Sequence, residues 1–278
     1  TLFRSQSEWF STFHLSLKKM ISLTTVQLNA WIAAFFFPLA RILALLAAAP
    51  PFSNPGLTTR VRLILGMAIA VAVTPALPTM PGVEPASAIG LLIFAQQLLI
   101  GFAIGFTLRL VFNAIDMAGT LIGYQMGLGF ATSYDPQNAS QSPVMSEFVG
   151  VLALLTFLSM NGHLMLLATL VHSFTQIPVG VGKLAAATWL NTANAGGVIF
   201  VSGVFLALPV VIALLITNIA LGILGRVAPQ LNLIVIGFPI TLILGFSALL
   251  VCLNYLAVPL QQLFEYGLDS MLRFFVLA

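Results

Sequence analysis

Charged side chains are scarce in this sequence: Asp, Glu, Lys and Arg make up 6% of its 278 residues. Soluble domains carry roughly 25% charged residues, which keep their surfaces hydrated. Apolar residues account for 60% of the chain, and its mean hydropathy is +1.09. This composition excludes an ordinary soluble protein and predicts one that is embedded in a membrane.

The residues that disulfide frameworks, metal centres and catalytic sites need are also few. The single cysteine, Cys252, lies in an apolar run and is interpreted as a small hydrophobic residue. His163 and His172 are nine residues apart, which is not a metal-ligating helical spacing. The chain has neither a GxSxG motif nor a nucleotide-binding glycine loop followed by Lys. We therefore predict that the protein is not an enzyme and uses no metal or other cofactor.

Basic residues outnumber acidic ones by ten to seven, which gives a net charge of +3, but they are scattered singly or in pairs. They form no basic face of the kind that binds nucleic acid. We interpret them as loop charges that orient membrane-spanning helices.

Long intervals without a charged residue predict an all-α integral membrane protein with five to seven long hydrophobic helices or hairpins. The apolar residues form unbroken runs, which favours helices over the alternating pattern of a membrane β-barrel. A spanning helix needs about 20 residues, and the charge-free intervals after Glu147, Lys183 and Arg226 are each longer. The predicted segments run from about 26 to 49, 63 to 77, 89 to beyond 116, 143 to 177, 197 to 224 and 233 to 258.

Two parts of the chain depart from this pattern. Asn161-Gly162, a turn-forming dipeptide, divides the segment 143–177 into halves that are too short to cross a membrane, which predicts a re-entrant or protein-buried hairpin. Residues 1–19 are polar and are predicted to be a foreign or disordered extension, with natural translation starting at Met20 and residues 20–278 forming one membrane domain. N-terminal sequencing of the natively expressed protein tests this start.

A polar stripe interrupts the third predicted segment. Arg109, Asn113, Asp116 and Thr120 follow one another at intervals of four, three and four residues, which places them on one face of a helix. Charges at membrane depth cost several kcal/mol unless they are paired or hydrated, so this face is expected to contact protein or water. It would then line a conduit or a subunit contact. Alternatively, Arg109 and Asp116 lie at the membrane interface, where the helix ends.

Glycines recur at four-residue intervals along the same segment. Gly101 and Gly105, and then Gly119, Gly123 and Gly127, have the small-xxx-small spacing that lets membrane helices approach closely. We therefore expect neighbouring helices to pack against this segment at its glycines.

Two polar stretches break the apolar segments. The stretch 123–136 combines three glycines within seven residues with the bulky side chains of Met126, Phe130 and Tyr134, so it is either a flexible channel plug or an ordinary loop. The stretch 226–232 carries polar side chains that can satisfy freed backbone groups in a protein interface, and is otherwise a simple turn between helices.

Five blocks of the sequence, in this order, resemble the FliR family of flagellar biosynthetic proteins, a family shared with virulence type III secretion systems. The blocks are 31–51, 97–106, 123–136, 161–164 and 221–239, and the resemblance extends over 20–278. It implies a subunit of the export gate at the centre of the flagellar basal body, in the bacterial inner membrane, through which unfolded flagellar proteins are secreted. The implied partners are FliP-like and FliQ-like gate subunits, FlhB-like and FlhA-like export components, and the translocated proteins.

The resemblance also implies roles for individual residues. A channel plug and its hinges would comprise Gln125, Met126, Gly127, Gly129, Phe130 and Asp135. A packing or subunit-contact motif would comprise Arg226, Pro229, Gln230 and Asn232. The family's gate helices assemble into a spiral cone, so the apolar helices need not all cross lipid. Conduction would be passive, with energy supplied by partner proteins and the proton gradient.

Three other functions are consistent with parts of the sequence. A virulence type III secretion gate uses the same family. A secondary transporter for a small solute needs a polar site on broken helices, for which Asn161, Gly162 and His163 are the candidates. An intramembrane enzyme needs His163, His172 and Asp135 to converge.

Overall fold

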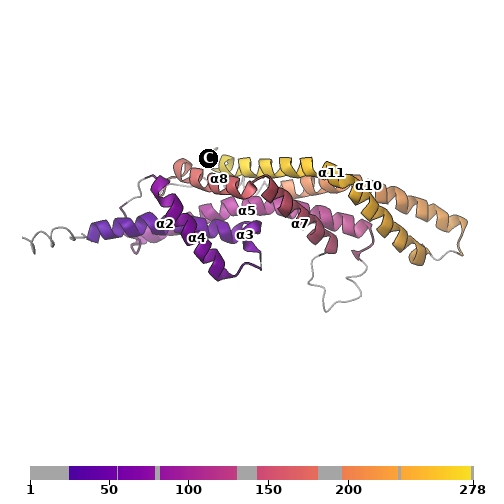
Figure 1. Cartoon of the computed structure of the whole chain (residues 1–278), viewed down its shortest axis with the longest axis horizontal. Helices are drawn as coiled ribbons and strands as arrows, with labels where there is room; N and C mark the ends of the chain where they lie inside the picture. Colours follow the sequence, from indigo (N-terminus) through magenta and orange to yellow (C-terminus); the bar gives the residue numbers. More distant parts are fainter. Residues whose placement is uncertain are drawn as a thin grey trace, which may run out of the picture.

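A computed structural model of the protein describes residues 25–54, 56–78, 82–129, 143–180, 196–230 and 233–276. These residues form helices joined by turns, and no strand occurs among them (Figure 1). The predicted extension 1–19 and the start at Met20 lie outside the described residues. The helices are α2 (Thr25–Ala48), α3 (Pro50–Ser53), α4 (Thr59–Val73), the 3₁₀-helix η1 (Thr74–Ala76), α5 (Ala88–Gln125), α7 (Val144–Ser159), α8 (Gly162–Gln176), α10 (Gly197–Val227) and α11 (Leu233–Val276).

Five helical segments of the described chain are long and apolar enough to cross a membrane: α2, α4 with η1, α5, α10 and α11. The pair α7 and α8 makes a sixth if it is counted as one span. The prediction of an all-α integral membrane protein with five to seven such segments is therefore confirmed.

α5 and α11 are longer than a membrane requires. At a rise of about 1.5 Å per residue, their 38 and 44 residues extend roughly 57 and 66 Å, about twice a hydrocarbon core of about 30 Å. α5 and the C-terminal part of α11 run along the long axis of the molecule, whereas the beginning of α11 slants away from it (Figure 1). The end of α10 and the beginning of α11 project beyond the rest (Figure 1). The surroundings of these two helices must therefore change along their length.

α11 continues past its predicted end at 258 because its last turns are amphipathic. Leu260, Phe264, Leu268 and Met271 follow one another at helical spacing, and all four side chains are buried. Packing of this apolar face against the core stabilises a helix that hydropathy alone would have ended earlier.

The break between α7 and α8 lies at Asn161, as predicted, but the two helices do not form an antiparallel hairpin. Their axes differ in direction by 66°, so the chain bends instead of reversing (Figure 1). Asn161 adopts the left-handed conformation, with φ of 57°, between the two helices. A Cβ on Gly162 would lie 2.8 Å from the carbonyl oxygen of Phe157, so the bend requires a glycine at this position.

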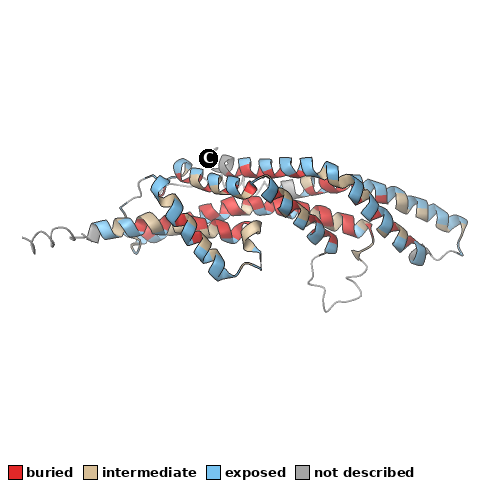
Figure 2. Ribbon diagram, viewed as in Figure 1, coloured by how far each residue is buried: buried red, intermediate tan, exposed pale blue. Residues whose placement is uncertain are grey.

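The core surrounds α5, which packs against α2, α7, α10 and α11. Figure 2 shows buried residues along α5 and on the inner faces of its neighbours, and exposed residues over α4 and the projecting parts of α10 and α11. Phe112 of α5, Phe157 of α7 and Phe264 of α11 lie with ring centroids 5.2 to 5.9 Å apart. These three buried rings join helices that are far apart in the sequence.

Glycines permit the closest helix contacts of the core, as expected. A Cβ on Gly101 would collide with the carbonyl oxygen of Arg41 in α2, and one on Gly105 would lie 2.7 Å from another carbonyl oxygen of that helix. About five turns further along the same side of α5, a Cβ on Gly119 would lie 2.5 Å from Cα of Ser146 in α7. The obstacles are backbone atoms, which cannot move aside unless the helices separate.

We expect Gly101→Ala to lower the melting temperature of the purified protein in detergent, because α2 and α5 must separate to admit the methyl group. Overpacking of this kind costs about 1–3 kcal/mol. Gly222→Ala in α10 is the control, since no atom lies within 4 Å of the added Cβ. Equal melting temperatures for the two variants would contradict the packing role of Gly101.

Candidate functional site

One face of α5 remains at the surface along most of the helix, although the other sides of α5 are packed. Along this face, exposed or half-buried residues recur every three or four positions and form one stripe, with Leu92 and Leu99 exposed beside its first half. We call this face the α5 stripe. Its residues are Leu91, Ala95, Leu98, Phe102, Phe106, Arg109, Asn113, Asp116, Thr120 and Tyr124.

The α5 stripe changes from apolar to polar at its middle. The residues from Leu91 to Phe106 are hydrocarbon, and those from Arg109 to Tyr124 all carry a polar group. Each half is about 23 Å long. The apolar half suits lipid or an apolar partner, whereas the polar half requires water or polar protein groups. α5 continues beyond Asp116 to Gln125, so these polar residues lie within a helix that is longer than a hydrocarbon core is thick.

The polar half of the α5 stripe is only partly bonded within the chain. Thr120 Oγ1 donates to the carbonyl oxygen of Asp116 at 2.8 Å, and the Asp116 carboxylate lies beside the hydroxyl of Ser146 in α7. Within the described residues, Arg109 and Asn113 form no side-chain hydrogen bond or ion pair. A guanidinium and a carboxamide are thus available to water or to a partner.

α5 ends in a hydrogen-bonded turn at Gly127. This residue has a φ of 83°, in the left-handed region that favours glycine. Its amide donates to the carbonyl oxygen of Tyr124 at 3.0 Å, and the amide of Leu128 donates to the carbonyl oxygen of Gly123 at 3.0 Å. These two bonds define a Schellman motif, which satisfies carbonyl groups that a helix end leaves free.

The described members of the predicted plug belong to this helix end. Gln125 is the last residue of α5, Met126 follows it with a fully buried side chain, and Gly129 lies close to the Tyr124 ring. Met126 is therefore part of the core. Phe130 and Asp135 lie outside the described residues, and the plug assignment stays a prediction.

The predicted contact motif lies in the turn between α10 and α11, at the projecting end of the molecule (Figure 1). Arg226 is in the last turn of α10, where a positive charge stabilises the helix terminus. Arg226, Pro229 and Gln230 are exposed, and their side chains form no hydrogen bond with other described residues. Asn232 lies outside the described residues. The motif thus connects two helices and leaves its polar side chains free for other contacts.

A buried polar cluster around Arg41 was not predicted. The Arg41 side chain is completely inaccessible, although α2 is an apolar helix. Nε donates to Gln97 Oε1 of α5 at 2.8 Å, and the terminal nitrogens donate to Ser173 Oγ at 3.0 Å and to the carbonyl oxygen of Ile177 at 2.9 Å. The centroid of the Phe174 ring is 4.1 Å from Cζ. The cluster therefore joins α2, α5 and the end of α8.

The charge of Arg41 is compensated without an acidic residue among the described ranges. The guanidinium faces the carbonyl end of α8, where the helix dipole is negative, and the electron-rich face of Phe174. A signal for this cluster was present in the sequence, because Arg41 is the only charged residue between Lys19 and Arg60. A lone charge in an apolar helix indicates a specific partner.

Residues 32–267 match the model of the family described as bacterial export proteins, family 1. The chain belongs to this family. The matched region contains the α5 stripe, the Schellman motif after α5 and the turn between α10 and α11.

This export protein is similar over most of its length to proteins named flagellar biosynthetic protein FliR. It is 42% identical over 246 residues to that of Escherichia coli (strain K12), which covers 88% of this chain and 94% of the relative. It is 40% identical over 252 residues to that of Pectobacterium carotovorum subsp. carotovorum, with coverages of 90% and 95%. For Bacillus subtilis (strain 168) the identity is 30% over 243 residues, with coverages of 86% and 93%. The resemblance to the FliR family is confirmed.

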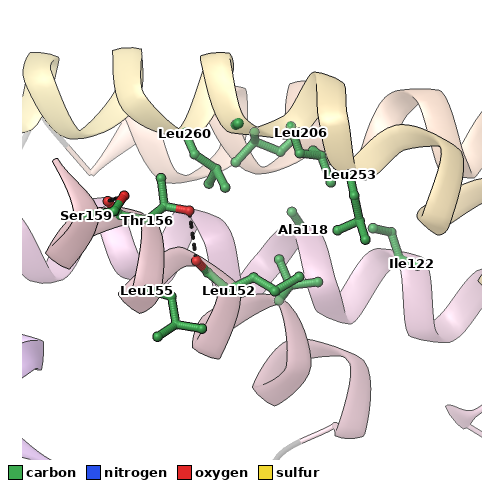
Figure 3. A pocket seen from close by; sticks show the side chains of 12 residues that line it. Ala118, Ile122, Leu152, Leu155, Thr156, Ser159, Leu206, Leu253 and Leu260 are labelled. Atoms are coloured by element: carbon green, nitrogen blue, oxygen red, sulfur yellow. Dashed lines mark hydrogen bonds between the residues drawn. The ribbon is translucent and has the colours of Figure 1, made fainter.

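A cavity of about 310 Å³ lies between α5, α7, α10 and α11 of this export protein. Figure 3 shows leucine side chains from three of these helices pointing into it. The Thr156 hydroxyl in its wall donates to the carbonyl oxygen of Leu152 at 2.9 Å and is therefore satisfied within its own helix. The cavity presents hydrocarbon, and the transporter candidates Asn161 and His163 do not line it.

The two histidines of α8 do not converge. His163 and His172 are nine residues apart, or about two and a half helical turns, so they lie on opposite sides of the helix. Asp135, the third candidate, lies outside the described residues. The described part of the chain also contains no group of three His, Cys, Asp or Glu residues that could hold a metal ion.

Arg41→Met is expected to lower the melting temperature of the purified export protein, because it leaves the acceptors of Gln97, Ser173 and Ile177 without their donor. A buried group without its partner costs about 1–3 kcal/mol. Arg41→Lys is expected to restore only part of this loss, since one ammonium group cannot reproduce the planar fork of donors.

The matched control for these variants is Arg109→Met, which removes the same side chain from an exposed position of α5. We expect its melting temperature to stay close to that of the unaltered protein. Equal losses in Arg41→Met and Arg109→Met would contradict a specific role for the buried cluster.

Proposed function

We propose that the chain is a subunit of the flagellar type III protein export gate, and that it helps to form and to plug the channel through which unfolded flagellar proteins are secreted. Its proposed location is the bacterial inner membrane, at the flagellar basal body. The nearly full-length similarity to proteins named flagellar biosynthetic protein FliR supports the flagellar system over a virulence secretion system. The export function in the family description and the membrane helices support a gate.

The observation that carries this proposal is the polar half of the α5 stripe. The central helix of an apolar protein exposes a guanidinium, a carboxamide and a carboxylate on one face. Lipid cannot solvate these groups. They are satisfied if this face lines a water-filled channel or meets polar faces of neighbouring gate subunits. FliP-like and FliQ-like proteins are the proposed neighbours, with FlhB-like and FlhA-like components as further partners.

The turn after α5 supports a plug that begins at Gly127. α5 is helical to Gln125, and Met126 is fixed in the core, so movement of the following segment would begin at Gly127. Glycine accepts the left-handed backbone there without the cost that other residues incur. We assign Gly127 and Gly129 to the hinge, and Phe130 and Asp135 to the plug. Its apolar side chains would close the channel by excluding water.

The turn between α10 and α11 supports a second contact with the gate. Its exposed side chains at the projecting end of the molecule could reach a neighbour without any rearrangement of the core. We assign Arg226, Pro229, Gln230 and Asn232 to this contact. In this scheme the chain conducts passively and carries out no chemical reaction, with energy supplied by partner proteins and the proton gradient.

Copurification tests the proposed gate most directly. A tagged copy of the chain should isolate FliP-like and FliQ-like proteins from flagellated cells. A protein that instead transported a small solute would be active alone, so uptake of a solute into proteoliposomes by this chain without partners would favour the transporter.

Cysteine accessibility tests the α5 stripe. In a Cys252→Ser background, we expect a membrane-impermeant maleimide to label Asn113→Cys in the chain expressed without partners, because a thiol must contact water to react. Phe102→Cys, on the apolar half of the same stripe, should remain unlabelled. Equal labelling at the two positions would contradict a polarity change along the stripe.

Deletion of residues 127–132 tests the plug. We expect the gate to assemble but to let small ions pass, because the segment that excludes water is gone. The measurement is membrane conductance in cells that express the deletion, compared with cells that express the unaltered chain. Unchanged conductance with a normal amount of assembled gate would exclude the plug assignment.

A further inference from the structure

We infer that Thr241 and Gly245 of α11 are positioning residues for the end of α5, the point at which the proposed plug begins. Both residues and Met126, which they contact, belong to the described part of the chain. The effect of these contacts on the closure of the channel rests on the proposed function. Neither residue belongs to a sequence motif singled out above.

Thr241 supplies a hydrogen-bond donor that the end of α5 lacks. Carbonyl groups in the last turn of a helix have no partner in their own helix. Those of Gly123 and Tyr124 accept from the amides of the Schellman motif. The carbonyl oxygen of Met126 accepts instead from Thr241 Oγ1 at 3.2 Å, across 115 positions of sequence. α11 thus completes the cap of α5.

Gly245 makes room for the side chain of Met126. That side chain is fully buried, and a Cβ on Gly245 would lie 2.6 to 2.9 Å from its Cγ, Sδ and Cε atoms. Thr241 and Gly245 are four residues apart, so both contacts lie on one face of α11. The backbone and the side chain of the residue that precedes Gly127 are therefore held by the same helix.

The hydrogen bond from Thr241 is easily exchanged. Its hydroxyl oxygen also lies 2.9 Å from the carbonyl oxygen of Phe238 in its own helix, and a hydroxyl has one proton to donate. The proton can turn from Met126 to Phe238 without leaving the hydroxyl unsatisfied. The hydrogen bond can therefore be released at low cost. The buried side chain of Met126 remains packed at Gly245, so a displacement of α11 would move the end of α5 through that side chain.

The contact is tested by a disulfide in the assembled gate, in membranes of cells that export flagellar proteins. In a Cys252→Ser background, Met126→Cys with Gly245→Cys is expected to cross-link on mild oxidation. Cγ of Met126, one bond from Cβ, lies 2.6 Å from the position of a Cβ on residue 245, which is within disulfide reach.

The control pair combines Met126→Cys with Gly237→Cys, more than two helical turns away on α11, and should not cross-link. Failure of the Met126→Cys, Gly245→Cys pair to cross-link would overturn the inference and would leave the proposed function untouched.

The positioning role is tested by ion leak through the assembled gate. Thr241→Val and Gly245→Ala are each expected to raise membrane conductance several-fold while the amount of assembled gate stays normal. The first removes the donor to Met126 without changing volume, and the second displaces the Met126 side chain. If Gly245→Ala lowers the amount of assembled gate, the result for Thr241→Val decides the test.

Matched controls are available on α10 and α11. Among the described residues, the hydroxyl of Thr217 bonds only to the carbonyl oxygen of Ala213 in its own helix, so Thr217→Val should not leak. Gly237→Ala should not leak because the nearest atom is 3.7 Å from the added Cβ. If the 127–132 deletion leaks but neither Thr241→Val nor Gly245→Ala does, the positioning role is overturned and the plug assignment is not. No leak in any of the three overturns the plug as well.

Discussion

Polar groups in the interior of this protein must find partners within the chain, because neither lipid nor a hydrocarbon core can supply them. Arg41 meets this constraint through acceptors from α5 and α8. The Thr107 hydroxyl meets it within its own helix, by donating to the carbonyl oxygen of Ala103 at 3.0 Å. An exception lies within the Arg41 cluster, where Gln97 Nε2 is a buried donor that has no acceptor among the described residues. Nothing in the structure explains that atom.

The same constraint makes α5 the central element of the fold. Its glycines bring the backbones of α2 and α7 into direct contact with it, and its aromatic residue Phe112 joins the rings of α7 and α11. Close backbone approach increases dispersion contacts, which stabilise helix pairs where lipid provides no hydrophobic driving force. A central helix that is so fully packed can expose only one face. The polar half of that face is therefore a distinctive surface of the molecule.

The surfaces proposed to contact other gate subunits or the channel lie where polar side chains have no hydrogen-bond partner among the described residues. Arg109 and Asn113 on the α5 stripe, and Arg226 in the turn after α10, are exposed and unbonded within the described residues. The core and these surfaces are connected, since α11 begins at the projecting turn and contacts the end of α5 through Thr241. A displacement at one end of α11 can thus reach the point from which the proposed plug departs.

The sequence alone determined the all-α membrane class and the approximate positions of the helices. Hydropathy, charge-free length and turn residues such as Asn161 act on each segment separately, so they can be read without knowing what packs where. The spacing of Arg109, Asn113, Asp116 and Thr120 likewise placed them on one face, because helical periodicity is a local property. The family was also accessible, through five ordered blocks of sequence.

Only the tertiary structure decided which polar and apolar residues are inside. It buried Arg41 in the core and placed the side chain of Met126 against Gly245 of α11. Each outcome depends on atoms from helices distant in sequence: the end of α8 for Arg41, and a missing Cβ on α11 for Met126. Local patterns carry no information about such partners, because the free energy of these contacts exists only once the helices have met.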